Sequence, residues 1–172
     1  MTTNFDNLNI NENILKGVYL YGFKEPSPIQ KKGIEAINTC KDCIIQSQSG
    51  TGKTATYLLG VFNKIIPNKN LQAIIIAPTR ELATQIYNVA IEISKFSKIV
   101  TTLFIGGDNN NYYLEDTNVI IGTIGRINHI FQNKKNKINN CNLMVIDEAD
   151  NMFIDGISED ISKLFNRLPE GC

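Results

Sequence analysis

Short apolar runs alternate along this chain with longer stretches in which apolar residues recur at helical spacing. The short β-branched and aliphatic runs predict strands, at residues 43–46, 73–77, 99–105, 119–121 and 143–146. The longer stretches predict helices, at residues 53–66, 81–96, 126–131 and 157–168. Apolar strands separated by helices are typical of a parallel sheet covered on both faces. The pattern therefore predicts an α/β fold, with solvated Asn-rich loops at residues 108–111 and 133–142.

The composition is that of one globular domain with balanced charge. The 172 residues include 17 Lys and Arg and 17 Asp and Glu, which excludes a strongly basic surface for nucleic acids. A few well-placed cations and backbone amides still suffice to bind phosphate groups. No apolar run approaches the ~20 residues of a membrane span, and residues 1–13 are polar without a signal-peptide pattern. We therefore expect a cytoplasmic protein, not associated with membranes, whose four cysteines are reduced thiols.

The segment 47–54, SQSGTGKT, follows one predicted strand and opens a predicted helix. Backbone N–H groups of such a loop and of the first helical turn converge on an anion. Gly50 and Gly52 let the backbone approach phosphate closely, Lys53 would neutralise the β and γ phosphates, and the Thr54 hydroxyl would coordinate Mg²⁺. The alternative is a glycine-rich turn that ends in a surface lysine, since Ser47 stands where a glycine is usual in this pattern.

The predicted strand 143–146 runs directly into Asp147-Glu148-Ala149-Asp150. Ligand sites of parallel sheets lie at the carboxyl ends of the strands, where these acids fall. Asp147 would hold Mg²⁺ through water, and Glu148 would orient or deprotonate an attacking water. The alternative is a solvated acidic turn that caps the next helix. Together with the phosphate loop, the acids favour nucleoside triphosphate hydrolysis, with Lys53, Thr54, Asp147 and Glu148 as the catalytic residues.

Cys40 and Cys43 have the spacing of half a zinc site. A structural zinc ion needs four ligands, and the sequence has no second close pair of Cys or His. We therefore expect no zinc site, and we expect Cys43 to be a small apolar residue in a buried strand.

Six short segments resemble, in the same order, the motifs of the DEAD-box RNA helicases: residues 22–30, 47–54, 78–83, 106–107, 123–126 and 147–150. The opening Phe5-Asp6 and the run 17–23 are most similar to the eukaryotic translation initiation factor 4A subgroup. The resemblance implies a three-layer α/β/α RecA-like P-loop domain over residues 23–172, preceded by an extension, residues 1–22, that leads into the Q motif. The implied activity is ATP-dependent unwinding or remodelling of RNA in translation initiation.

The resemblance also assigns roles in nucleotide binding. Phe23 would stack on adenine, Gln30 would hydrogen-bond the adenine edge and select ATP over GTP, and Phe5 would support this pocket. Taken without the family, Phe23 could be plain core packing and Gln30 a polar helix residue. The implied nucleotide-binding residues are Phe5, Phe23, Gln30, Ser49, Gly50, Thr51, Gly52, Lys53 and Thr54.

The RNA-binding residues implied by the resemblance fall at or just beyond predicted strand ends. They are Pro78, Thr79, Arg80, Gly106, Gly107, Thr123, Gly125 and Arg126. Arginine suits bidentate contact with phosphate, and glycine lets backbone amides reach it. Such contacts read the sugar–phosphate backbone, so we expect sequence-independent binding of single-stranded RNA. A scaffold protein of translation initiation is a further partner that the resemblance implies.

The sequence departs from the family pattern in four places. One is the segment 108–118 after Gly107, which is shorter than the helix-containing segment of the family. Ser47 stands in the phosphate loop where Ala or Gly is common, and Ile124 stands where the family has Pro. The chain also ends at Cys172, before the motif III strand and the second RecA-like domain of the family. We therefore expect an incomplete first domain that does not unwind RNA alone. A non-catalytic RNA- or partner-binding fragment and a generic P-loop ATPase are the alternative functions.

Overall fold

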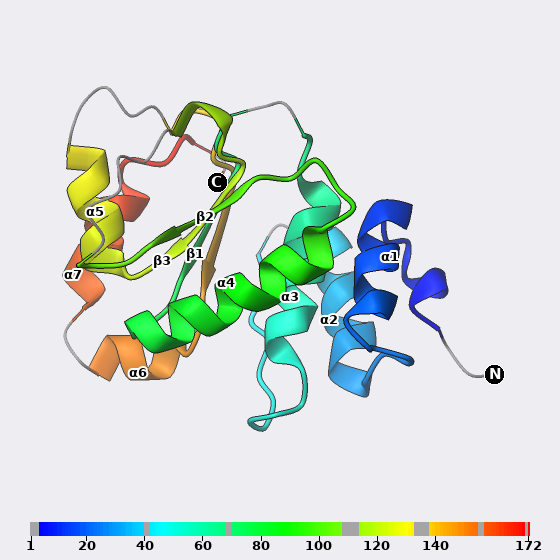
Figure 1. The fold of residues 1–172 in the computed structure, drawn as a ribbon. Helices are drawn as coiled ribbons and strands as arrows, with labels where there is room; N and C mark the ends of the chain where they lie inside the picture. The colour runs from blue at the N-terminus through cyan, green and yellow to red at the C-terminus, as the bar shows by residue number, and fades with distance from the viewer. Residues whose placement is uncertain are drawn as a thin grey trace. The chain divides into compact units, whose positions relative to one another are not determined.

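The computed structural model (Figure 1) describes residues 4–39, 42–67, 70–107, 114–132, 138–154, 157–170 and 172. The chain divides into two compact units. The first unit comprises residues 1–65 and 89–98, and the second comprises residues 66–88 and 99–172.

The first unit is helical. Its elements are η1 (Phe5–Leu8), α1 (Glu12–Leu20), α2 (Pro28–Thr39), α3 (Lys53–Lys64) and the end of α4 (Arg80–Ser94). Helix α1 begins at Asn11, whose side chain accepts a hydrogen bond from the Asn13 N–H at 2.9 Å. Gly17 of α1 allows a close approach to the end of α4, because a Cβ there would lie 1.9 Å from the Ile93 carbonyl oxygen. The fully buried side chains of this unit include Phe5, Ile14, Ile34, Leu58 and Leu59.

The second unit contains a four-stranded parallel sheet. Its strands are β1 (Ala73–Ile76), β2 (Thr101–Phe104), β3 (Val119–Gly122) and β4 (Leu143–Ile146), in the spatial order β2-β3-β1-β4. Ala73 of β1 lies opposite Val119 on one side and opposite Leu143 on the other. All four residues of β1 are fully buried, as expected for an inner strand made of Ala and Ile.

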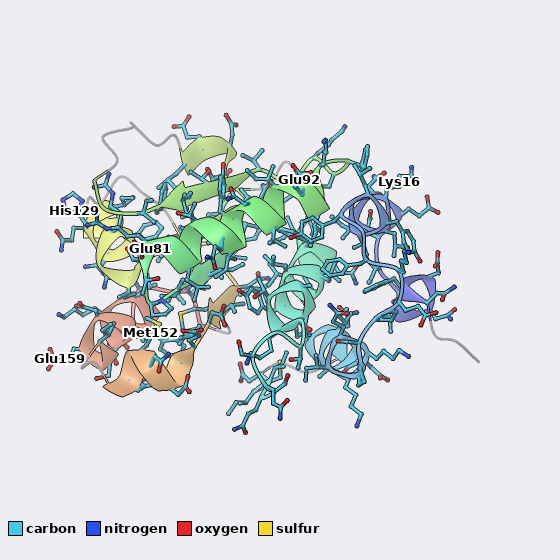
Figure 2. All side chains as sticks on the ribbon, turned by 60° about the horizontal axis from the view of Figure 1, so that its bottom comes forward. Lys16, Glu81, Glu92, His129, Met152 and Glu159 are labelled. Atoms are coloured by element: carbon cyan, nitrogen blue, oxygen red, sulfur yellow. The ribbon has the colours of Figure 1, made fainter. Side chains whose placement is uncertain are left out.

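Three helices cover one face of this sheet: α5 (Ile124–Gln132), α6 (Ala149–Ile154) and α7 (Ser158–Phe165). They bring Ile127, Met152 and Leu164 into one apolar cluster with Ile74 and Ile120 of the sheet; Figure 2 labels Met152 on α6. Residues of the opposite face, Ala73, Ile75, Val119 and Ile121, have no exposed surface either. Both faces of the sheet are therefore covered, and the predicted α/β class with a parallel sheet is confirmed. A short turn, η2 (Leu114–Asp116), precedes β3.

The structure contradicts one predicted strand. Residues 43–46 form no strand, Cys43 is exposed, and Ile44 has 98% of its surface exposed. An extended segment becomes a strand only when a neighbouring segment pairs with it along a ladder, and residues 43–46 are not among the strands of the sheet β2-β3-β1-β4. The predictions of a buried strand and of a buried Cys43 are therefore wrong.

The other predicted strands and helices agree with the structure to within a few residues. Strand β4 begins and ends where the pattern placed it, and α3, α4, α5 and α7 fall within the predicted helical stretches or extend them by one or two residues. Helices α1, α2 and α6 were not predicted. The predicted loop 108–111 and residues 133–137 of the second loop lie outside the described residues. Within the described parts of the chain, no helix is both long and apolar enough to cross a membrane.

Candidate nucleotide-binding and nucleic-acid-binding sites

The phosphate-loop segment closes on itself ahead of α3. Gly50 and Gly52 have φ values of 78° and 99°, and Gly52 is the N-cap of α3. The Lys53 ammonium donates to the Ser47 carbonyl oxygen at 2.6 Å, and the Thr51 hydroxyl donates to the Gln48 carbonyl oxygen at 2.8 Å. The hydroxyls of Ser47 and Thr51 also contact each other. A lysine at the start of a helix, held back against its own loop, is placed for an anion bound at that helix terminus.

Ser27 and the first turn of α2 connect the predicted base-binding segment to the phosphate loop. Gln30 is 3% exposed, and its Oε1 accepts the Ser27 backbone N–H at 2.8 Å. The Ser27 hydroxyl in turn donates to the Thr51 carbonyl oxygen at 3.0 Å. A Cβ on Gly52 would lie 2.7 Å from Gln30 Nε2, so the glutamine amide lies against the loop. Gln30 is thus a buried polar residue beside the phosphate loop and not a solvated residue of a helix surface.

Phe5 and Phe23 also lie in the first unit and are in ring contact. Their centroids are 6.1 Å apart with an interplanar angle of 48°. Phe5 is fully buried, whereas Phe23 is half-buried. The predicted support of one ring by the other therefore has a matching geometry. Sequence reasoning did not identify two tyrosines that join this pair: Tyr19 lies edge-on to Phe5 at 6.3 Å, and Tyr21 is tilted on Phe23 at 5.1 Å.

The acidic segment begins where β4 ends. The Asp147 N–H still donates to the Ile76 carbonyl oxygen of β1 at 2.9 Å, and α6 starts two residues later. Between them Glu148 has a φ of 47°, in the left-handed region that non-glycine residues rarely occupy. Its N–H donates to Asp147 Oδ1 at 3.0 Å, and its carboxylate accepts the Asn151 side-chain amide at 3.1 Å. Sequence reasoning missed Asn151, whose only signal is a position three residues beyond Glu148.

The predicted RNA-binding residues lie in the second unit, directly after the strands. Because β1, β2 and β3 are parallel, the segments that follow them start at the same edge of the sheet. Arg80 lies against the glycine doublet: a Cβ on Gly106 would be 2.7 Å from Arg80 Nη2, and one on Gly107 would be 3.6 Å from Nη1. The Thr79 hydroxyl accepts the Leu82 N–H at 3.1 Å at the start of α4.

The third segment of this set follows β3. The Thr123 N–H donates to the Phe104 carbonyl oxygen at 3.1 Å, and the Thr123 carbonyl oxygen accepts the Ile127 N–H of α5 at 3.1 Å. Gly125 is exposed, and Arg126 is half-buried. Ile124, which stands where the family has Pro, is 6% exposed and belongs to the apolar cluster under the sheet. The isoleucine that replaces proline at this position therefore packs in the core of the second unit.

The predicted site residues divide between the two units. The first unit holds all the predicted nucleotide-binding residues, including Lys53 and Thr54, whereas the second holds Asp147, Glu148 and the predicted RNA-binding residues. Among the described residues, no group of three or more His, Cys, Asp or Glu side chains could hold a metal ion. Cys40 lies outside the described residues, and Cys141 is buried next to Cys172, which raises the pKa of the Cys141 thiol.

A glycine-containing loop that opens a helix, in a chain with a parallel sheet of this kind, defines the P-loop class of nucleotide-binding proteins. The sequence pattern of the DEAD/DEAH box helicase domain matches residues 27–171. The chain belongs to the DEAD/DEAH box helicase family.

Curated relatives and solved structures agree with this assignment. The chain is 42% identical over 175 residues to the ATP-dependent RNA helicase eIF4A of Emericella nidulans, a match that covers 99% of the chain and 44% of that relative. It is also 42% identical to the eIF4A of Chaetomium globosum, covering 96% of the chain and 43% of the relative. The chain thus spans less than half the length of the relatives it matches.

Two solved structures show the same fold. One is Saccharomyces cerevisiae Dbp5 bound to RNA and ADP BeF3, with a TM-score of 0.91 and 34% identity over 98% of this chain and 44% of that one. The other is a DEAD box protein from the hyperthermophile Methanococcus jannaschii, with a TM-score of 0.87 and 29% identity over 98% of this chain and 47% of that one. The RecA-like fold predicted from the sequence is therefore confirmed.

Proposed function

We propose that this chain binds ATP and supplies the nucleotide-binding part of an ATP-dependent RNA helicase. One observation carries the proposal: a buried glutamine and the phosphate loop are joined by hydrogen bonds through Ser27. An amide can donate and accept at once, as the edge of adenine requires. Gln30, which would bond the base, is thus connected by hydrogen bonds to the loop that would bind the phosphates. This arrangement fits a site that binds both the base and the phosphates of a nucleotide.

The first unit would bind the nucleotide. Phe23 would stack on adenine with Phe5 behind it, and Gln30 would bond the adenine edge. Residues 49–54 would surround the phosphates with backbone N–H groups, and Lys53 would exchange its bond to the Ser47 carbonyl for phosphate oxygens. Phe23 is half-buried, so part of its side chain is accessible to a ligand, which supports this assignment.

The residues proposed for hydrolysis are Lys53, Thr54, Asp147 and Glu148. The hydroxyl of Thr54 and the carboxylate of Asp147 are oxygen donors that fit Mg²⁺, with Asp147 acting through water. When bound, Mg²⁺ would neutralise charge on the β and γ phosphates. Glu148 would orient or deprotonate the attacking water, and the amide of Asn151 would help to fix its carboxylate. The chain spans less than half of its relatives, so this activity is proposed for the whole protein.

The second unit would bind single-stranded RNA through its sugar–phosphate backbone. Arg80 lies against Gly106 and Gly107, which sets a cation beside a backbone that has no side chains to block phosphate. Pro78, Thr79, Thr123, Gly125 and Arg126 would complete this surface. Phosphate contacts carry no sequence information, so the binding is expected to be independent of sequence.

We further propose a role in translation initiation, which the name eIF4A of the relatives supports. A cytoplasmic location and a scaffold protein of that process as partner are part of the same proposal. This part of the proposal rests on similarity of the whole chain and not on any one site.

Isothermal titration of the chain with Mg-ADP and Mg-GDP tests the nucleotide site. We expect ADP to bind more tightly than GDP, and Lys53→Ala to weaken ADP binding roughly 10- to 100-fold, the range of a hydrogen bond to a charged group. Lys64→Ala is the matched control, because Lys64 is the last residue of the same helix, α3, and should bind ADP like the unaltered chain.

The outcomes separate the alternatives. Retained ADP affinity in Lys53→Ala would contradict the phosphate-loop assignment, and equal affinity for ADP and GDP would contradict the base-reading role of Gln30. RNA binding without any nucleotide binding would favour a non-catalytic RNA-binding fragment. An ATPase rate of the whole protein that is the same with and without RNA would favour a generic P-loop ATPase.

A further inference from the structure

Four aromatic rings gather at the C-terminal end of α1 in the first unit. Phe23 contacts two of them, Phe5 at 6.1 Å and Tyr21 at 5.1 Å between ring centroids. Tyr19 in turn lies edge-on to Phe5, with an interplanar angle of 85°. Tilted and edge-on pairs at these distances are favourable arrangements for aromatic rings. Phe23 is therefore held by ring contacts with two different partners.

The end of α1 explains why Tyr21 and Phe23 are neighbours in space. Tyr21 is the C-cap residue, and Gly22 follows with a φ of 102°. The Phe23 N–H donates to the Val18 carbonyl at 3.2 Å, and the Gly22 N–H donates to the Tyr19 carbonyl at 3.1 Å. These two bonds form a Schellman motif, which fixes the backbone on both sides of the glycine. The motif sets the direction from which each ring leaves the chain.

The Phe5 side of the array is fixed by a second contact. The Tyr19 hydroxyl donates to the Asp6 carboxylate, which raises the pKa of Tyr19. Asp6 lies in η1 next to Phe5, so this bond ties η1 to α1 and holds the fully buried Phe5 in place. The loop after η1 is held in addition by Asn63, whose amide donates to the Asn9 carbonyl at 2.9 Å. Phe5 thus gives Phe23 a rigid support on one side.

Tyr21 differs from Phe5 in its exposure. It has 43% of its surface exposed, whereas Phe5 has none. A ring this exposed contributes little to the core of the unit, yet it lies closer to Phe23 than Phe5 does. The contact between Tyr21 and Phe23 therefore restrains a half-buried ring at the surface more than it stabilises the fold.

We propose that Tyr21 is a positioning residue for the nucleotide base: its ring holds Phe23 in the orientation in which Phe23 stacks on adenine. This inference rests on the proposed function, in which Phe23 is the adenine-stacking residue. Tyr21 acts through Phe23 and not on the phosphates, so its effect is confined to ligands that carry a base. The ring and not the hydroxyl has this effect, because the contact is between the two rings, which are tilted by 37°.

Titration with two ligands tests the proposal: Mg-ADP, which has a base, and inorganic tripolyphosphate with Mg²⁺, which has none. Tyr21→Ala should weaken ADP binding roughly two- to tenfold, the range to which aromatic pair energies convert, and leave tripolyphosphate binding unchanged. Tyr21→Phe keeps the ring and should therefore bind ADP as tightly as the unaltered chain does. Leu20→Ala is the matched control, because Leu20 is the neighbouring residue and is 59% exposed; it should bind both ligands normally.

Two results would overturn the proposal: ADP affinity in Tyr21→Ala equal to that of Leu20→Ala, or an equal loss for ADP and tripolyphosphate, which indicates a general structural role. Phe23→Ala separates this failure from that of the proposed function. If Phe23→Ala weakens ADP binding and Tyr21→Ala does not, only the role of Tyr21 is wrong. If Phe23→Ala leaves ADP binding unchanged, the adenine site itself is wrongly placed and the inference falls with it.

Discussion

The phosphate loop and the acidic segment both turn the backbone into the left-handed region directly before a helix, but with different residues. Gly52, with a φ of 99°, precedes α3, whereas Glu148, with a φ of 47°, precedes α6. Glycine adopts this conformation at little steric cost, while a residue with a Cβ is strained by about 1–2 kcal/mol. The loop presents backbone groups, so glycine suffices there. The acidic segment presents a carboxylate at this position, and the fold tolerates the strain.

The two segments also differ in the chain that leads into them. Strand β4 pairs with β1 along its whole length before it reaches Asp147. Residues 43–46, which precede the phosphate loop, also contain two adjacent isoleucines, but they end in the polar Gln46, have no place in the sheet and leave Ile44 exposed. A run of β-branched apolar residues thus favours a strand but does not guarantee one. The run becomes a strand only where a neighbouring segment forms hydrogen bonds with its backbone.

The largest expected effect contrasts Ile74, in the strand β1 that pairs with β4, with Ile44, in the segment that joins no strand. Ile74→Ala removes a fully buried side chain from the core of the second unit and should lower the free energy of unfolding by about 2–5 kcal/mol. Ile44→Ala removes a side chain that is 98% exposed and should change it by less than about 0.5 kcal/mol. For a chain of this size, thermal unfolding should show a midpoint lower by roughly 5–15 °C for the first variant alone.

A similar loss of stability in both variants would contradict the comparison. Ile44 would then be buried in solution, and residues 43–46 would pair with another strand after all. A normal midpoint for Ile74→Ala would instead contradict the core assigned to the second unit.

The next effect concerns the two glycines of the phosphate loop. Both have positive φ, so Gly50→Ala and Gly52→Ala should each lower stability by about 1 kcal/mol. A Cβ at Gly50 meets nothing within 4 Å, whereas one at Gly52 lies 2.7 Å from Gln30 Nε2 and displaces the amide. Gly52→Ala should therefore also reduce the preference for ADP over GDP, measured by titration, while Gly50→Ala keeps it. An equal preference for ADP over GDP in the two variants would mean that Gln30 does not contact the base.

The sequence predicted the parts of the fold that depend on local pattern. The buried run Leu143–Ile146 became β4 residue for residue, and Lys53 opens α3 as the glycine loop indicated. These predictions succeed because apolar content, glycine positions and helix starts are properties of neighbouring residues.

Some parts that the sequence did not predict depend on contacts between residues far apart in the chain, and others depend on the backbone geometry between near neighbours. The failed strand at 43–46 depended on a pairing partner, and the bond from Ser27 to Thr51 joins residues 24 positions apart. The role of Tyr21 could not be identified either, since it follows from a Schellman motif and from ring packing. Asn151 contacts Glu148 where the backbone turns into the left-handed region just before α6, a turn that the sequence pattern did not indicate.

The smallest effect tests the strain at Glu148 directly. Glu148→Gly and Glu148→Ala both remove the carboxylate and its bond to Asn151, but only glycine relieves the left-handed backbone. Glu148→Gly should therefore unfold at a midpoint roughly 2–4 °C above Glu148→Ala, which corresponds to about 1 kcal/mol in a chain of this size. Equal midpoints would mean that the backbone at this position relaxes without penalty. The acidic segment would then resemble the phosphate loop in strain as well as in shape, and the carboxylate would be held there without any loss of stability.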